Sequence, residues 1–371
     1  MNNKRTIIII ILLILIGGEF SLMASPQKQV LEFSTAGFFN SPQLRTVYNF
    51  NPAWRFFKGK ANGAECVDFD DKDWQVVHLP NGIELLPSEA SGCINYQGEV
   101  WYRKHFTINE KEHVKRWVLH FEGIMGKSKV WINGILIKKS VCGYLPLVID
   151  VTQYLKMNDK NVVTVWADNS NEPNYPPGKA QDVLDFTYFG GIYRDVWLYG
   201  TNSIFITDPN EEDKIAGGGV LVAYENVSKQ SADILLKTDV KNLSDSSFKG
   251  KVVYELFDKE NRLVATSISV INLSKGKSRQ TNEIRMKIMK PHLWYPSTPY
   301  LYNLIVKIVN NQGTIQDGYR QRLGIRSIEF RGKKGLFLNG KHYDRPLMGA
   351  NRHQDFALIG PVSYTHLRAH E

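Results

Sequence analysis

Short strand-like runs separated by turn residues fill most of the chain and limit it to a β-rich fold. Runs of β-branched and aromatic residues occur at 114–121, 129–132, 135–137, 147–151 and 161–166. Asn133-Gly134 lies between the second and third runs, and this pair is typical of a two-residue hairpin because both residues tolerate positive φ. Few stretches repeat with the period of a helix. The spacing predicts a β-sandwich over residues 30–202.

A second group of strands is predicted after a glycine-rich seam. The charged residues 208–214 lead into Gly217-Gly218-Gly219, where the chain can turn without steric cost. Apolar and polar residues then alternate along 232–240, 250–258 and 301–309. Residues 203–326 therefore have the length and pattern of an immunoglobulin-like β-sandwich. Beyond Arg326 the pattern changes, and a further hairpin signal follows at 337–341.

The N-terminal residues have the pattern of an export signal. Lys4 and Arg5 precede an unbroken apolar run at 7–16, and small residues near Ala24 suit cleavage. This run is shorter than the roughly 20 residues that a membrane-spanning helix needs. We therefore expect residues 1–24 to be a signal peptide and the protein to be exported, periplasmic or secreted, with no membrane attachment after cleavage. A single N-terminal membrane anchor is the alternative.

The charge balance does not indicate a nucleic-acid partner. The chain has 46 Lys and Arg against 37 Asp and Glu, which gives a formal net charge of +9. These charges are scattered along polar faces, so they predict a solvated basic surface. Cys66, Cys93 and Cys142 are odd in number and lack metal-ligand spacing. One disulfide is left open, and its pairing does not follow from the sequence.

Three motifs differ from the general strand pattern. Residues 189–198 contain Gly190-Gly191, which permits a tight turn or a close approach before a strand resumes, and Asp185 lies just upstream. By itself, such an Asp is usually a turn residue or a cap. Residues 291–302 combine prolines with aromatic residues that suit packing in a sandwich core. Residues 347–355 gather donors and acceptors suited to sugar hydroxyls.

Taken in order, these motifs resemble glycoside hydrolase family 2. The chain resembles the sugar-binding domain of that family at 101–104, 121–123, 130–134, 143–146 and 189–194. Residues 291–302 and 324–326 resemble the end of its immunoglobulin-like domain. The resemblance implies a mainly β chain, with a jelly-roll-like sugar-binding sandwich followed by an immunoglobulin-like sandwich. Residues 327–360 would then begin a TIM barrel, the (β/α)8 catalytic domain.

The resemblance also implies a reaction. The family hydrolyses terminal β-glycosides with retention, using two Glu residues about 5–5.5 Å apart as acid/base and nucleophile. A barrel needs about 250 residues, whereas 45 residues follow Arg326. Both catalytic Glu residues are therefore expected beyond Glu371, and the chain is expected to be an N-terminal fragment that is inactive alone. Residues 361–371 form a tail that does not match the family.

Four substrate-binding residues are implied by the resemblance. Asp185 matches a carboxylate that reaches sugar hydroxyls, and Asn95 matches an Asn of the first domain that faces the sugar. His353 matches a barrel His that lines the same pocket, and Arg352 beside it contacts the sugar or braces the loop. No metal ligand or cofactor is expected in this chain, although the full-length enzyme could hold a divalent cation, as some β-galactosidases of the family do.

The triplet Asn351-Arg352-His353 resembles β-galactosidases, whereas β-glucuronidases more often carry Lys in place of Arg352. We therefore predict a β-galactoside-containing oligosaccharide or polysaccharide as the substrate, and a role in carbohydrate metabolism. The alternatives are β-glucuronidase or β-mannosidase specificity, or a non-catalytic carbohydrate-binding protein made of two sandwiches. Assembly as a homo-oligomer is left open.

Overall fold

The structure is a computed structural model, and it describes residues 45–84, 96–111, 113–141, 143–174, 176, 178–184, 188–215, 217–345, 355–356 and 360–361. All of them belong to one compact unit that spans residues 33–371. The predicted signal peptide, the tail after residue 361, Cys93 and Cys142 lie outside the described residues. Cys66 has a free, exposed thiol.

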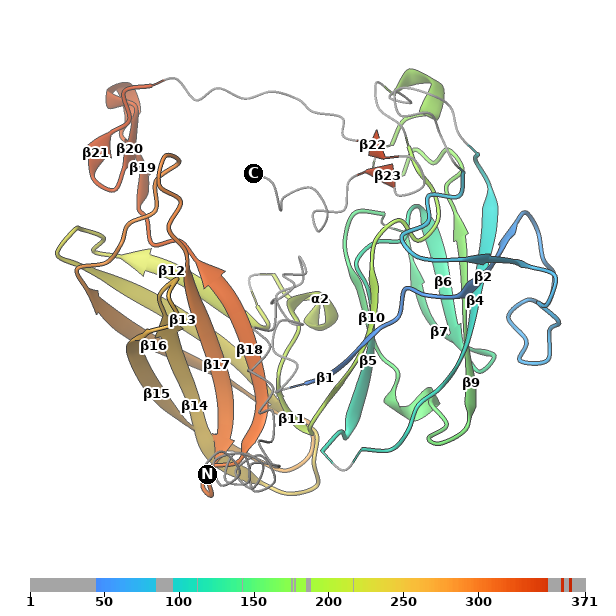
Figure 1. Cartoon of the computed structure of the whole chain (residues 1–371), viewed down its shortest axis with the longest axis horizontal. Helices are drawn as coiled ribbons and strands as arrows, with labels where there is room; N and C mark the ends of the chain where they lie inside the picture. The colour runs from blue at the N-terminus through green and yellow to red at the C-terminus, as the bar shows by residue number, and fades with distance from the viewer. Residues whose placement is uncertain are drawn as a thin grey trace, which may run out of the picture. The chain divides into compact units, whose positions relative to one another are not determined.

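The first sandwich is built from two antiparallel sheets (Figure 1). Its four-stranded sheet has the order β1–β10–β5–β8, formed by Thr46–Asn49, Val196–Thr201, Arg116–Phe121 and Leu147–Asp150. Its six-stranded sheet has the order β3–β2–β4–β9–β6–β7, formed by Gln75–Val77, Trp54–Lys58, Glu99–Thr107, Lys160–Asp168, Lys127–Ile132 and Ile135–Ser140.

The core of the first sandwich lies between these sheets. Trp54 and Tyr102 of the six-stranded sheet pack in one buried cluster with Leu119 and Phe121 of the four-stranded sheet. Burying such large apolar side chains removes them from water, which is the main favourable contribution to folding. The two sheets are therefore held face to face by their inward side chains.

The hairpin predicted at Asn133-Gly134 is confirmed. These residues connect β6 to β7 with φ values of 51° and 81°, the left-handed conformation that such a turn requires. The side chain of Asn133 also donates to the carbonyl of Tyr154 at 2.8 Å and to Oδ1 of Asn161 at 2.9 Å. The turn is thus tied to the neighbouring loop as well as to its own strands.

The second sandwich consists of two more sheets (Figure 1). One has the order β11–β13–β12 with β16 beside β13, formed by Ile204–Ile206, Ser231–Asn242, Val220–Glu225 and Ser278–Met289. The other has the order β15–β14–β17–β18, formed by Leu263–Leu273, Phe248–Phe257, Tyr302–Asn310 and Ile315–Leu323. Strand β11 pairs with β13, so the second sandwich gains its first strand before the glycine seam at 217–219.

The predicted mainly β class is confirmed by these sheets. The only α-helix among the described residues is α2 (Pro209–Glu212), which Asp208 caps by accepting the backbone N–H groups of Asn210 and Glu211. Short 3₁₀ helices occur at η2 (Thr152–Tyr154), η3 (Gln181–Val183) and η4 (Gly332–Lys334). In the part of the chain that is described, no helix is long and apolar enough to cross a membrane.

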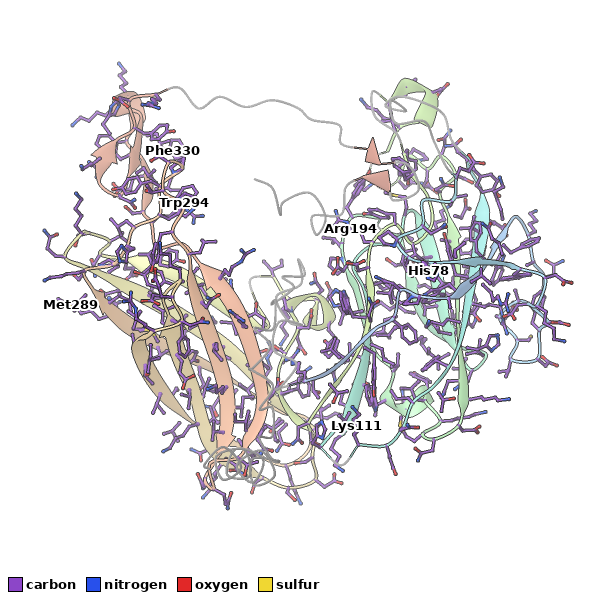
Figure 2. The ribbon with its side chains drawn as sticks, viewed as in Figure 1. His78, Lys111, Arg194, Met289, Trp294 and Phe330 are labelled. Atoms are coloured by element: carbon purple, nitrogen blue, oxygen red, sulfur yellow. The ribbon has the colours of Figure 1, made fainter. Side chains whose placement is uncertain are left out.

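A small sheet follows the second sandwich, in the order β19–β20–β21 (Ile328–Phe330, Leu336–Leu338, Lys341–His342). Its second hairpin turns at Asn339 and Gly340, both at positive φ, which confirms the signal at 337–341. The amide of Asn339 donates to the carbonyl of Trp294 at 3.0 Å, and Trp294 is labelled in Figure 2. Strands β22 (Asp355–Phe356) and β23 (Gly360–Pro361) pair with each other.

Candidate functional site

The four residues that the sequence assigned to the substrate lie outside the described residues. Asn95 belongs to the gap 85–95, Asp185 to the gap 185–187, and Arg352 and His353 to the gap 346–354. Their roles therefore stay predictions. The segments that flank Asn95 and Asp185 are described.

Hydrogen bonds join the described residues on the two sides of the gap 85–95. The carboxylate of Glu84 accepts the backbone N–H of Tyr96 at 3.0 Å and pairs with the ammonium of Lys58 at 2.9 Å. The hydrogen bond from Lys58 is the main reason why the pKa of Glu84 is lowered. Asn169 adds two contacts, because its amide donates to the carbonyl of Tyr96 and accepts the N–H of Gly98. Both ends of residues 85–95 are thus held together.

The glycine pair downstream of Asp185 packs against this base. A Cβ on Gly190 would lie 2.3 Å from Cδ1 of Ile83 and 2.6 Å from Nδ2 of Asn169. Gly191 has a φ of 73°, and a Cβ there would lie 2.1 Å from the hydroxyl of Tyr102. Only glycine permits so close an approach in this conformation. The described flanks of Asn95 and Asp185 therefore lie side by side, at one end of the first sandwich.

Buried aromatic residues hold the strand after Asp185 in place. Tyr188 and Tyr193 form a buried cluster with Met125, and the hydroxyl of Tyr193 donates to the carbonyl of Gly143. The backbone N–H of Met125 donates to the carbonyl of Gly191 at 2.9 Å. These contacts join the loop after β5 to the described segment 188–193 that follows residues 185–187.

Arg194 follows the segment 188–193, and the sequence analysis did not assign it to the site (Figure 2). Its guanidinium carbon lies 5.4 Å from the centre of the Tyr193 ring, and its buried Nε has no hydrogen-bond partner among the described residues. The guanidinium brings a positive charge to this end of the first sandwich. The sequence signal was the run 189–198 itself, which was interpreted for its glycines and for its family resemblance.

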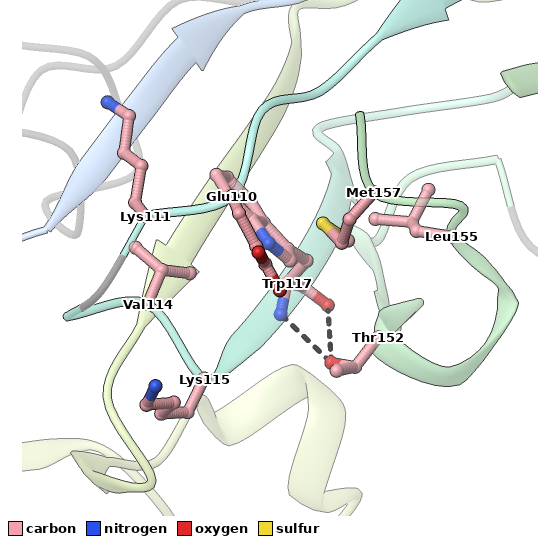
Figure 3. Close-up of a pocket in the computed structure, with 8 residues that line it drawn as sticks. All are labelled: Glu110, Lys111, Val114, Lys115, Trp117, Thr152, Leu155 and Met157. Carbon is pink, nitrogen blue, oxygen red and sulfur yellow. Dashed lines mark hydrogen bonds between the residues drawn. The ribbon is translucent and has the colours of Figure 1, made fainter. Parts of the chain in front are cut away.

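A separate pocket of about 590 Å³ lies where β5 begins, at the opposite end of that strand from Met125 (Figure 3). The backbone N–H of Trp117 donates to the hydroxyl of Thr152 at 2.9 Å on its wall. Its lining residues are Glu110, Lys111, Val114, Lys115, Trp117, Thr152, Leu155 and Met157. They come from two separate segments, 110–117 and 152–157, so no single motif predicts the pocket, and it lies away from the flanks of Asn95 and Asp185.

Metal-binding residues do not gather in the described part of the chain. No group of three or more His, Cys, Asp or Glu side chains lies close enough there to hold an ion. The divalent cation expected for the full-length enzyme stays a prediction.

Two family models match the chain. Residues 68–202 match the model described as "Glycosyl hydrolases family 2, sugar binding domain", and residues 220–326 match the model described as "Glycosyl hydrolases family 2". The two matches cover the first and second sandwiches in turn. The first of them includes the glycine pair and the flanks of both predicted substrate loops.

Proteins named β-galactosidase and proteins named β-glucuronidase are both similar to this chain. A β-galactosidase of Thermoanaerobacter pseudethanolicus is 32% identical over 317 residues, which are 85% of this chain and 40% of that protein. A β-glucuronidase of Formosa agariphila is 29% identical and is covered over 31% of its length. The solved structure of a Bacteroides uniformis β-glucuronidase is 28% identical, with a TM-score of 0.74 over 85% of this chain and 36% of that one. The chain thus spans less than half the length of each of these proteins.

Proposed function

The chain belongs to glycosyl hydrolases family 2, and on that premise we propose that it is the substrate-positioning part of a retaining hydrolase of terminal β-galactosides. The observation that carries the proposal is the meeting of the flanks of Asn95 and Asp185 at one end of the first sandwich. Two polar loops that emerge from one place can contact the same sugar ring. The relatives include glycosidases of more than one specificity, which supports carbohydrate as the class of substrate.

Each assigned side chain has a definite chemical task in this proposal. The carboxylate of Asp185 accepts hydrogen bonds from sugar hydroxyls, whereas the amide of Asn95 both donates and accepts. His353 lines the same sugar pocket, and Arg352 contacts the sugar or braces the loop that carries His353. Hydrogen bonds of this kind orient the glycosidic bond, and orientation lowers the entropic part of the barrier.

The bond-breaking groups of the proposed reaction are two Glu residues on later barrel strands. One protonates the leaving oxygen while the other attacks the anomeric carbon, and water then hydrolyses the glycosyl-enzyme with the first Glu as base. The family resemblance assigns neither Glu to the 371 residues of this chain. We therefore propose that these residues alone release no product from a β-galactoside.

Galactoside specificity is favoured over glucuronide specificity by Arg352. β-Glucuronidases more often carry Lys at this place in the triplet 351–353. The ammonium of Lys is a compact point charge, whereas the guanidinium of Arg is planar with five fixed donors, so the two recognise different oxygen patterns. The names of the relatives support both specificities, so substrate choice rests on this triplet.

Sequencing the genomic DNA downstream of the codon for Gly360, and expressing the reading frame found there, tests the proposal. We expect the frame to encode a barrel with two Glu-bearing strands, and its product to hydrolyse a chromogenic β-galactoside faster than the β-glucuronide or the β-mannoside. Faster cleavage of the glucuronide would assign the other specificity. A frame without a barrel would support the non-catalytic carbohydrate-binding alternative. The 371-residue chain and a mock-purified sample are the matched controls.

We also propose that the protein is exported. The support is the sequence pattern of residues 1–24 alone, with Lys4 and Arg5 before the apolar run and Ala24 at the expected cleavage point. An exported glycosidase would meet polysaccharide outside the cytoplasm, in agreement with the proposed substrate.

A further inference from the structure

The outer face of the six-stranded sheet carries a row of aromatic and charged side chains. Strand β9 lies between β4 and β6, and its Trp166 is directly opposite Trp101 on one side and Lys129 on the other. Val100 and Tyr102, the neighbours of Trp101, face the core between the sheets. Because side chains alternate along a strand, Trp101, Trp166 and Lys129 share the face that points away from that core.

A pocket of about 450 Å³ lies over this row. The ring of Trp101 stacks on that of Trp131 with the centroids 5.7 Å apart, and the ammonium of Lys129 lies 4.8 Å from the centre of the Trp166 ring. The pocket is lined by Ala61, Asn62, Gly63, Glu65, Glu99, Trp101, Lys129, Trp131 and Trp166. Trp101 and Trp131 are buried, so the half-buried Trp166 is the most exposed of the three indoles, and it lies beside an amide, two carboxylates and an ammonium.

Residues 61–65 form one wall of the pocket, and a buried arginine beneath them donates hydrogen bonds to this part of the chain. Arg103 is fully buried and donates to Asp71 at 2.8 Å, to the carbonyl of Cys66 at 2.9 Å and to the hydroxyl of Thr164 at 3.1 Å. It also donates to the carbonyl of Ala64, next to Glu65. A pocket wall that is ordered before binding loses little entropy when a ligand arrives, so it favours affinity.

Two carboxylates and one indole N–H of the pocket have no hydrogen-bond partner among the described residues. Among the described residues, the side chains of Glu65 and Glu99 form no hydrogen bond or ion pair, and Lys129 has no carboxylate partner. The Nε1–H of Trp101 is buried and donates to no described acceptor. Buried polar groups are normally paired, so the unpaired Nε1–H of Trp101 beside two open carboxylates indicates a ligand that donates and accepts hydrogen bonds.

We propose that this pocket is an accessory binding site for a neutral saccharide unit. Hydroxyl groups both donate and accept, so they can satisfy the two carboxylates and the ammonium together. The C–H face of a pyranose ring is apolar and would replace the ammonium of Lys129 on the indole of Trp166. Glu65 and Glu99 outnumber Lys129, and this negative balance opposes an acidic sugar. The site uses none of the residues assigned to the reacting sugar, and it would hold a neighbouring part of a polysaccharide.

Native affinity electrophoresis of the 371-residue chain tests the proposal. Gels would contain soluble galactan, glucomannan or neutral arabinoxylan as the neutral probes, and polygalacturonate as the acidic probe. We expect at least one neutral polymer to retard the chain and polygalacturonate not to do so. Trp166→Ala should raise the apparent dissociation constant at least ten-fold, which corresponds to about 1.4 kcal/mol.

A second variant keeps the test valid if Trp166→Ala fails to fold. Glu65→Gln combined with Glu99→Gln preserves the size of both side chains and should weaken binding to the same neutral polymer at least ten-fold. Phe330→Ala, at an exposed aromatic residue of β19, is the matched control and should bind as the wild type does. Retardation by none of the neutral polymers, equal retardation by polygalacturonate, or unchanged binding of the Glu variant would overturn the proposal.

Discussion

Arg45 donates two hydrogen bonds to the carboxylate of Asp317, from Nε at 2.8 Å and from Nη2 at 2.7 Å, although 272 positions separate the two residues. The side chains are only 2% and 0% exposed. Burial alone would lower the pKa of Arg45, but the charge and hydrogen bonds of Asp317 raise it above its ordinary value. Asp317 also accepts the N–H of Ile206 at 2.8 Å, so this pair joins the segment before β1 to β11 and β18.

Breaking this buried ion pair should be costly. Asp317→Leu leaves the guanidinium of Arg45 buried without its partner, and such a loss destabilises by about 3–5 kcal/mol. The double variant Arg45→Met with Asp317→Leu should recover most of the loss, because neither charge is then buried. Urea denaturation of the two variants and the wild type measures both effects. Asp70→Asn, which removes the exposed pair with Lys72, should leave the midpoint unchanged. Equal midpoints for the single and double variants would contradict this account.

His120 should make the protein less stable in mild acid. Burial in β5 lowers its pKa to about 3 from an ordinary value of 6.5. Between these values the unfolded state binds a proton that the folded state does not, so stability falls as pH decreases from about 6.5 to 3, by roughly 1 kcal/mol per pH unit. We expect His120→Phe to have a flatter slope than the wild type in urea denaturation at pH 6, 5 and 4. Other groups titrate in this window, so the difference between the slopes is the quantity to measure, and identical slopes would refute the prediction.

Gly191→Ala should destabilise the protein far more than the same substitution at a glycine of positive φ that has no close neighbours. Its φ is 73°, which costs a residue with a Cβ about 1–2 kcal/mol, and the new Cβ would also lie 2.1 Å from the hydroxyl of Tyr102. Gly313→Ala is the matched control, because Gly313 has a φ of 86° with nothing within 4 Å of a new Cβ. Thermal unfolding should show a clearly larger loss of Tm for Gly191→Ala. Equal losses would mean that the contact with Tyr102 is easily relieved.

In the full-length enzyme, Asp185→Ala should lower kcat/KM for β-galactosides by about ten-fold to several-hundred-fold. A hydrogen bond to a charged acceptor contributes about 1.5–3 kcal/mol, and each 1.4 kcal/mol corresponds to about ten-fold in rate. Asp182→Ala, at an exposed residue of η3, is the matched control. If Asp185 were only a turn residue, its substitution would lower Tm by the equivalent of about 1 kcal/mol and leave kcat/KM unchanged.

The mature N-terminus should lie close to Ser25. The apolar run at 7–16 and the small residues before Ser25 direct signal peptidase to this place. N-terminal sequencing of the protein recovered from outside the cytoplasm measures it directly. An intact Met1 in a membrane fraction would instead establish an N-terminal anchor.

Local patterns in the sequence were sufficient to predict some of the strands, among them β5 to β9, β13, β14 and β17. The run at 129–132, the turn at Asn133-Gly134 and the return at 135–137 became β6, its hairpin and β7, because period-two alternation and a left-handed turn depend only on neighbouring residues. The mainly β class and the family resemblance follow from the same local motifs. The substrate roles of Asp185, Asn95, Arg352 and His353 rest on that resemblance and remain predictions.

Tertiary structure alone decided which distant residues meet. The register of β4, β9 and β6 places Trp101, Trp166 and Lys129 in one row, although each comes from a different segment of the chain. A shift of one residue in any of these strands would turn its side chains to the other face. In the same way, Arg45 finds Asp317 only once both sandwiches have formed. Such pairings depend on the packing of whole sheets, because local periodicity selects which face of a strand is buried but not which strand lies beside it.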